Sequence, residues 1–122
     1  MNTSGLRSVV FLVALGLMIQ SAGFARQQPA DAQVLFQAAM NVEVVEGNLE
    51  RAIALYQQII DQAGVNRALA ARALVRLGDC YQKLRRQEAQ SVYQRVIREY
   101  ADQTEAVQTA QADSARSAEP DF

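Results

Sequence analysis

Apolar side chains recur along the middle of the chain at the spacing of an α-helix. In residues 52–60, and again in residues 89–97, they stand at positions i, i+3, i+4, i+7 and i+8, which places them on one helical face. No run of strand length in this region alternates apolar with polar residues, and the residue types that dominate it favour helix. The pattern predicts an all-α fold.

Four helices are expected, at residues 32–46, 49–62, 67–84 and 87–101. Gly47 and Asn48 separate the first two, because Gly suits the left-handed position after a helix and Asn suits the N-cap of the next one. Asn66 is the expected N-cap of the third helix. Short connections between helices favour antiparallel neighbours, so the four helices should form two hairpins.

The first helix of each hairpin is expected to bury one stripe of side chains and to expose the opposite one. In the helix at 67–84, the expected buried stripe consists of Ala70, Leu74, Leu77, Tyr81 and Leu84. The opposite stripe, expected to face solvent, consists of Arg72, Arg76, Asp79 and Lys83. In the helix at 32–46, the apolar stripe consists of Leu35, Phe36, Ala39, Val42 and Val45.

The two hairpins repeat each other in sequence. Residues 52–60 match residues 89–97 at a shift of 37, with identical residues at four positions and apolar residues at two more. The matched positions include the whole apolar stripe of each segment. Self-similarity at such a period is the signature of stacked helical repeats, so we expect the hairpins to stack side by side.

Residues 1–25 are expected to be a signal peptide. Arg7 precedes an unbroken apolar run at residues 9–19, and small residues follow at Gly23 and Ala25, in the order typical of a secretory leader. The run is too short for an ordinary spanning helix. Cleavage after Ala25, or alternatively after Gly23, predicts export to the periplasm or out of the cell, with no membrane attachment afterwards. A buried core helix and an uncleaved anchor are the alternatives, and residues 26–31 form a short linker.

Residues 32–102 resemble the tetratricopeptide repeat family, with repeats at 32–65 and 67–102. The family motif is W-x2-L-G-x2-Y followed by A-x3-F. The second repeat carries this motif as Leu74, Leu77, Gly78, Tyr81, Ala89 and Tyr93. The first repeat carries it more weakly, as Phe36, Gly47, Ala52 and Tyr56.

The small residues of the motif let the helices of a hairpin approach, and the large aromatic residues fill the space beside them. The sequence departs from the family pattern at several positions. Glu43 replaces the Tyr of the first repeat, Ala39 and Met40 replace its Leu-Gly pair, and Arg85 replaces the turn Gly of the second.

The resemblance implies a bacterial exported protein that binds another protein or a peptide, as an adaptor or scaffold. The first helix of each repeat should line the groove. In the first repeat, the implied groove residues are Gln37 and Asn41, with Val34 and Val44. In the second repeat they are Arg72, Val75, Arg76, Asp79 and Gln82. Asn41, Arg72 and Arg76 resemble parts of a carboxylate clamp, but Gln37 stands where that clamp has Lys.

Residues 103–122 are expected to form a partial capping helix and a polar tail. Asp102 and Glu105 have the spacing of a capping box. The expected buried anchors are few: Val107, Ala110, and Ala112 or Ala115. Beyond Asp113 the composition predicts a frayed tail. A last repeat left uncovered favours self-association as an alternative role, and a further alternative is that the chain is the N-terminal fragment of a larger multidomain protein.

Charge divides along the chain, although the formal net charge is only −1. Residues 67–98 carry eight basic and two acidic side chains, whereas the flanking segments 31–66 and 99–122 carry five and six acidic side chains against one basic each. These blocks are either solvated helix faces or a basic middle that meets an acidic surface, such as the chain's own tail or a second copy. Nucleic acid fits poorly, because no aromatic side chains interleave the arginines.

No set of residues in the sequence indicates catalytic activity. The chain has no His and one Cys, which excludes most metal sites and His-based nucleophile systems, and no cofactor is expected. Glu43, Glu46 and Glu50 lie at a polar helix end, where we expect them to be solvated rather than to act as an acid–base pair. Cys80 is either a small buried filler or the source of an intermolecular disulfide.

Overall fold

The computed structural model describes residues 31–62 and 64–119. These residues form five α-helices and no strand: α2 (Ala32–Val44), α3 (Leu49–Asp61), α4 (Arg67–Lys83), α5 (Glu88–Glu99) and α6 (Thr104–Ala118). The predicted all-α fold is therefore confirmed. The expected signal peptide at 1–25 and the linker through residue 30 lie outside the described residues.

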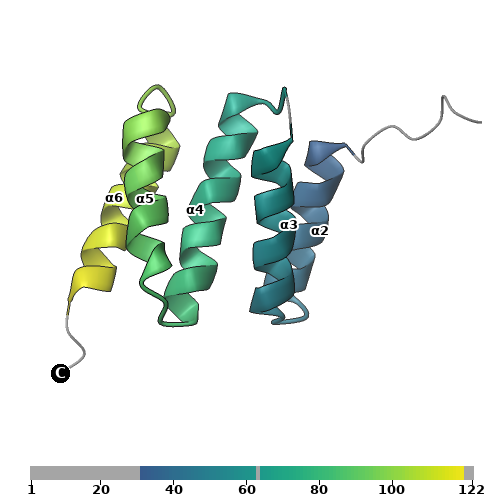
Figure 1. Ribbon diagram of the computed structural model, residues 1–122, viewed down its shortest axis with the longest axis horizontal. Helices are drawn as coiled ribbons and strands as arrows, with labels where there is room; N and C mark the ends of the chain where they lie inside the picture. The colour runs from purple at the N-terminus through teal and green to yellow at the C-terminus, as the bar shows by residue number, and fades with distance from the viewer. Residues whose placement is uncertain (1–30, 63, 120–122) are drawn as a thin grey trace, which may run out of the picture.

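The helices stand side by side in chain order (Figure 1). α2 packs against α3 and α4 against α5, which are the two predicted hairpins, and α3 packs against α4 where the hairpins stack. α6 packs against both α5 and α4. In addition, α4 contacts α2 on one side and α6 on the other, so the first helix of each hairpin and α6 together form one layer.

The predicted helix boundaries hold where a capping side chain begins a helix or a glycine follows its end. Asn48 accepts a hydrogen bond from the Arg51 N–H, and Asn66 accepts from the N–H groups of Ala68 and Leu69. Gly47 has a φ of 65°, the left-handed conformation that favours Gly after a helix. Arg85, which stands in the turn between α4 and α5, also has a positive φ, of 54°.

The repeat-motif residues build the core. Ala52, Tyr56, Ala89 and Tyr93 are buried, as predicted, and Phe36 packs edge-on against the Tyr56 ring with 5.9 Å between the centroids. Tyr81 is half-buried and accepts a hydrogen bond from Gln57 on α3. The motif thus joins the two helices within each hairpin and also the two hairpins to each other.

The predicted wet face of α4 is narrower than expected: none of Arg72, Arg76, Asp79 and Lys83 is buried, but Arg76 and Asp79 are only partly exposed. Nine of its residues are buried, among them Leu69, Ala71, Val75 and Cys80, which lie outside the predicted stripe. Because α4 is covered by α3 and α5 and also contacts α2 and α6, its exposed residues are limited to Arg67, Ala68, Arg72 and Lys83.

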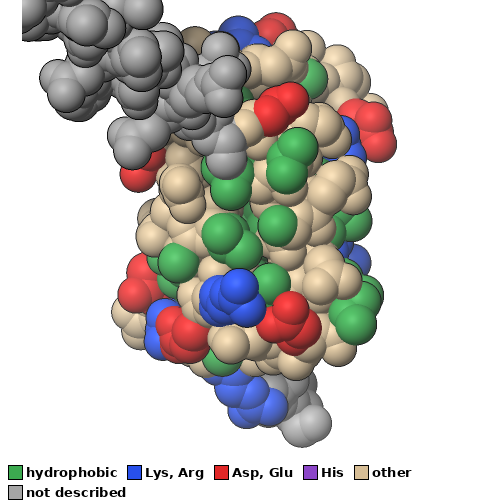
Figure 2. Space-filling view, turned by 90° about the vertical axis from the view of Figure 1, so that its right-hand side faces the viewer, with side chains coloured by type: hydrophobic (Ala, Val, Ile, Leu, Met, Phe, Trp, Pro, Cys, Tyr) green, Lys and Arg blue, Asp and Glu red, His purple; other side chains and the backbone are tan. Residues whose placement is uncertain are grey.

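The predicted buried stripe of α2 is wrong at its C-terminal end. Val45 is 76% exposed, whereas Glu43 is buried. Val34 and Val44 are also exposed, at 62% and 65%. Figure 2 looks onto the end of the molecule formed by the first hairpin and shows hydrophobic side chains scattered over it.

The C-terminal region is more ordered than its composition predicts. α6 begins next to Gln103, as expected, but no side chain caps it and the capping box of Asp102 and Glu105 does not form. The helix continues to Ala118, so the predicted fraying beyond Asp113 is wrong. Its buried residues are Ala106, Ala110 and Asp113, while Val107 is half-buried and Ala112 and Ala115 are exposed. α6 packs against α5 and α4, so it covers the last repeat as the expected capping helix would, and the uncovered end assumed by the self-association alternative is absent from the described residues.

Candidate partner-binding groove

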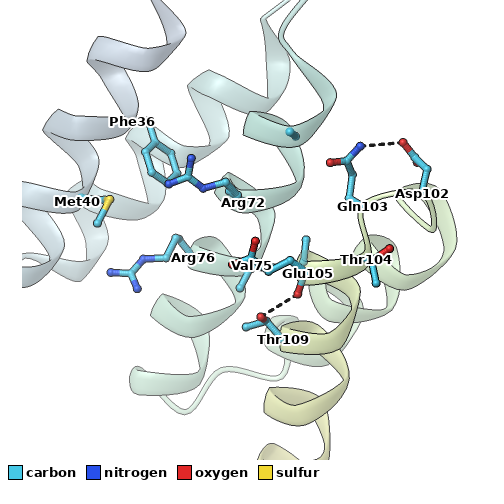
Figure 3. A pocket seen from close by; sticks show the side chains of 12 residues that line it. Phe36, Met40, Arg72, Val75, Arg76, Asp102, Gln103, Thr104, Glu105 and Thr109 are labelled. Carbon is cyan, nitrogen blue, oxygen red and sulfur yellow. Dashed lines mark hydrogen bonds between the residues drawn. The ribbon is translucent and has the colours of Figure 1, made fainter.

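A groove with a cavity volume of about 440 Å³ lies across α2, α4 and α6. Figure 3 shows it from close by, with side chains converging from all three helices. Its lining residues are Phe36 and Met40 from α2; Ala68, Arg72, Val75 and Arg76 from α4; and Asp102, Gln103, Thr104, Glu105, Ala106 and Thr109 from α6 and the turn before it. The groove therefore mixes apolar side chains with charges of both signs.

Arg72 lies on the α4 wall of this groove. Its guanidinium carbon is 4.8 Å from the centroid of the Phe36 ring, within the range of a cation–π interaction. Phe36 is 1% exposed, so the ring beneath the guanidinium is held by the core. Figure 3 shows the two side chains one against the other.

Arg76, one turn further along α4, is held by Glu43 of α2. Its Nε and a terminal nitrogen lie 3.1 and 3.0 Å from Glu43 Oε2. Lys83 Nζ lies 2.8 Å from Glu43 Oε1, and the Tyr56 hydroxyl donates to Oε2 at 2.8 Å. The Glu43 side chain is 0% exposed. Both of its oxygens are therefore hydrogen-bonded and its charge is balanced by two cations from the second repeat.

The expectation that Glu43 is solvated is thus wrong, whereas Glu46 and Glu50 are exposed as expected. Arg76 and Lys83, which cover Glu43, follow it by 33 and 40 residues, and no local pattern shows that they return to it. Burial also raises the pKa of the Tyr56 hydroxyl, which bonds to Glu43.

Asp79 and Gln82 were predicted to line the groove, but they bind Tyr93 instead. The Tyr93 hydroxyl lies 2.8 Å from Asp79 Oδ1 and 3.1 Å from Gln82 Oε1. Burial raises the pKa of the Asp79 carboxyl, and the bond from Tyr93 opposes that shift. Neither residue lines the cavity. Both accept hydrogen bonds from Tyr93 and so hold α5 against α4.

On α2 the residues that line the cavity each precede a predicted groove residue by one position. Phe36 and Met40 reach the groove, while Gln37 and Asn41 are exposed beside it and do not line the cavity. Of the groove residues predicted in the second repeat, Arg72, Val75 and Arg76 do line it. Contact of any of these side chains with a partner stays a prediction.

The α6 wall was missed altogether as part of a binding site. Gln103, Thr104, Glu105 and Thr109 come from the segment predicted only as a weak cap. No local pattern in this segment indicates a groove wall, because the packing of α6 against α4 is what brings these side chains to the groove.

The basic middle of the chain pairs with acidic side chains from both flanking segments. Arg67 at the start of α4 binds Asp102, with Nε 3.2 Å from Oδ2, and donates to the Glu99 carbonyl at 2.8 Å. The hydrogen bond from Arg67 holds the pKa of the Asp102 carboxyl below its usual range. Arg86, after α4, binds Glu50 of α3. The charge blocks therefore pair segments of one chain that lie far apart in the sequence.

Cys80 is fully buried in the core. Burial raises the pKa of its thiol to about 12, and the nearby Glu43 carboxylate adds to the shift. The buried position favours a structural filler over an intermolecular disulfide, because a thiol without solvent access reacts slowly.

Residues 31–62 and 64–119 contain no group of three or more His, Cys, Asp or Glu side chains placed to hold a metal ion. Over the same residues, none of the helices has both the length and the apolar character needed to cross a membrane.

Comparison with known proteins adds one finding. The model of the tetratricopeptide repeat family matches residues 72–103, which span most of α4, all of α5 and the turn that leads into α6. No curated protein and no solved structure is significantly similar to the chain. The matched residues cover most of the hairpin in which Gly78, Ala89 and Tyr93 pack together, so the match supports a tetratricopeptide repeat in this part of the chain.

Proposed function

We propose that this protein is a non-catalytic adaptor or scaffold of the cell envelope, which binds a segment of another protein in the groove across α2, α4 and α6. The family match supports a protein-interaction module. The observation that carries the proposal is the open cavity of about 440 Å³ with apolar and charged side chains from three helices. Concave sites that combine apolar surface with a few polar groups are typical binding sites.

The size of the groove supports a peptide segment as the ligand. A cavity of this volume holds a few side chains, and its three walls come from helices that pack on one another through the core. Because these walls are preformed, a partner pays little to order them on binding. Export rests on the leader-like sequence of residues 1–25.

A site-specific photo-crosslinker separates the groove from the rest of the surface. We place it at Thr109, an exposed groove residue on α6, and as the matched control at Gln94, an exposed residue of α5 that does not line the cavity. Incubated with envelope extract, the Thr109 protein should give discrete adducts that the Gln94 protein lacks. Identical adducts from both positions would count against the groove.

A second variant blocks the groove without disturbing the core. Thr109→Trp adds a large ring to an exposed position at the cavity, and we expect it to abolish capture of the partner while the melting temperature stays unchanged. Export is tested independently, since protein recovered from outside the cytoplasm should begin at Arg26, or at Phe24 if cleavage follows Gly23, when its N-terminus is sequenced. Full-length protein confined to the cytoplasm would refute export and leave groove binding untouched.

A further inference from the structure

A separate cavity, with a volume of about 600 Å³, lies at the end of the molecule where α4 turns into α5 and where α6 ends (Figure 1). No described residue lines both this cavity and the groove across α2, α4 and α6. Among the described residues that line it, one is acidic, Glu119, and three are basic: Arg85, Arg86 and Arg116. The others, apart from Ala89, are neutral and polar. Positive charge therefore predominates in a cavity that offers almost no apolar surface.

The turn between α4 and α5 fixes the backbone of the first two arginines. The Arg85 N–H donates to the Gln82 carbonyl and the Arg86 N–H donates to the Tyr81 carbonyl, both at 2.9 Å. These two hydrogen bonds form a Schellman motif, in which the residue after the helix takes a left-handed conformation that favours Gly. Here that residue is Arg85, with a φ of 54°.

The conformation of Arg85 favours a role for its side chain. A residue with a Cβ atom is strained in this region, and backbone strain is concentrated at functional sites. Gly would end α4 in the same way without strain, but it would remove one of the three guanidinium groups from the cavity. The strained residue and the cavity that it lines therefore indicate the same place.

The other two arginines are held at the cavity by carboxylates that do not line it. Arg86 binds Glu50 of α3, and Arg116 Nη1 lies 3.1 Å from Asp113 Oδ1. The two arginine side chains are 40% and 69% exposed, and exposed ion pairs contribute little in water. Each guanidinium has five N–H donors, and each of these pairs is made through one terminal nitrogen. Both arginines therefore keep donors for a ligand.

We propose that this cavity binds the phosphate group of a larger molecule, with Arg85, Arg86 and Arg116 donating hydrogen bonds to the phosphate oxygens. An arginine can donate two parallel hydrogen bonds to one phosphate. A phosphate also offers three strong acceptor oxygens, which suits guanidinium groups that arrive from two distant segments of the chain.

The size of the cavity indicates that the phosphate is part of a larger molecule. A volume of about 600 Å³ exceeds that of a phosphate ion and lies in the range of small-molecule sites. The phosphate belongs either to a soluble phosphate ester or to the headgroup of a phospholipid. Both sources present the same chemistry to the arginines, and different probes distinguish them.

The soluble source is tested by titrating glycerol 3-phosphate into the full chain at constant ionic strength, with glycerol as the neutral control. NMR follows the Nε–Hε signals of the arginines. Those of Arg85, Arg86 and Arg116 should shift with glycerol 3-phosphate and stay unchanged with glycerol.

Two variants test whether the cavity is the site. Arg85→Gly removes a guanidinium and relieves the strained φ, so it should fold at least as well as the unmodified chain. It should nevertheless bind glycerol 3-phosphate about tenfold more weakly, the loss expected for a charged hydrogen bond. Arg98→Gln is the matched removal of an exposed α5 arginine that does not line the cavity, and it should bind as tightly as the unmodified chain.

The phospholipid source is tested by flotation with vesicles of phosphatidylglycerol and, as the reference, of phosphatidylcholine. All variants share residues 1–25, so any contribution of this apolar segment is the same for each. A preference for phosphatidylglycerol that Arg85→Gly loses and Arg98→Gln retains would assign the site to a lipid headgroup. Binding of glycerol 3-phosphate without that preference would assign it to a soluble ester. Either result supports the phosphate site.

Three results would overturn the proposal. The first is that neither glycerol 3-phosphate nor phosphatidylglycerol vesicles bind. The second is an equal loss of affinity in Arg85→Gly and Arg98→Gln, which would show a general attraction to positive charge. The third is that glycerol shifts the arginine signals as much as glycerol 3-phosphate does. None of these results bears on the groove, because the cavity has its own lining residues.

Discussion

The ring of Tyr93 lies directly against the backbone of Gly78, so close that a Cβ atom at residue 78 would stand 2.5 Å from Tyr93 Cε1 and 2.9 Å from Cδ1. Tyr93 is fully buried and its hydroxyl is held near Asp79 and Gln82. The ring therefore cannot move aside easily. This contact sets the distance between α4 and α5 in the hairpin that matches the tetratricopeptide repeat family.

The first prediction concerns this contact. Gly78→Ala should lower the free energy of unfolding by about 1–3 kcal/mol through overpacking, although Ala is the better helix former by about 1 kcal/mol. Urea unfolding followed by circular dichroism measures the change. In a Tyr93→Leu background the clash is gone, so the same substitution should become neutral or stabilising. An equal loss in both backgrounds would rule out the ring as its cause.

The second prediction concerns the buried carboxylate of Glu43. Glu43→Ala should cost about 2–4 kcal/mol, because it leaves the buried Tyr56 hydroxyl, the partly buried Arg76 and the exposed Lys83 without their shared partner. Glu46→Ala is the matched control three residues away, where an exposed ion pair with Arg51 is lost and at most about 1 kcal/mol is expected. Similar losses of unfolding free energy for the two variants would show that the buried contacts of Glu43 stabilise the fold no more than the exposed ion pair of Glu46 does.

The third prediction concerns the strained turn between α4 and α5. Arg85 has a φ of 54°, which disfavours any residue with a Cβ atom, so Arg85→Gly should be more stable than Arg85→Ala by about 1 kcal/mol. Comparing two variants that both lack the arginine side chain isolates the backbone effect. At Gln94, inside α5, the order should reverse, with Ala more stable than Gly by about 1 kcal/mol. Thermal melts of the four variants decide the matter.

The fourth prediction concerns pH. Burial raises the pKa of Asp79, so the folded state holds this proton more tightly than the unfolded state, in which the pKa is about 3.9. The stability that comes from Asp79 is therefore present below that pH and is lost as the pH rises through the folded pKa. Asp79→Asn should gain stability relative to the unmodified protein as the pH is raised from about 4 toward neutrality. Urea unfolding at several pH values measures the difference.

Asp102 supplies a control of opposite sign. Its pKa is lowered by the bond from Arg67, so its contribution to stability is present above the unfolded pKa and is lost as the pH falls through the folded pKa. Asp102→Asn should therefore be less stable than the unmodified protein near neutrality, and the two should converge in acid. If both variants follow the same pH trend, the opposite environments of Asp79 and Asp102 are not the cause.

The fifth prediction concerns the single thiol. Because Cys80 is buried with a pKa raised to about 12, the folded protein should not react with Ellman's reagent, whereas denatured protein should release one equivalent per chain. Non-reducing gels of air-exposed protein should show a monomer. Rapid reaction in the folded state, or a disulfide-linked dimer, would revive the intermolecular alternative.

The sequence by itself determined the helices, their pairing and the second-repeat packing. Apolar periodicity, the N-cap Asn66 and the left-handed Gly47 act over a few residues, so their consequences can be predicted from neighbours along the chain. Because residues 52–60 match residues 89–97 at a shift of 37, the sequence also predicted that the two hairpins stack. Ala52 and Ala89 are buried accordingly.

Only the tertiary structure decided the composition of the groove. Glu43 has the local setting of a solvated residue and is buried because Arg76 and Lys83 return to it from α4. Through the same contact Arg76 is neutralised, while Arg72, one turn earlier on the same helix, lies on Phe36. Helical periodicity predicts which side chains share a face. It does not predict which of their charges are paired, because Glu43, the partner of Arg76, lies more than thirty residues away in the sequence. The stacking of the helices brings these two residues together.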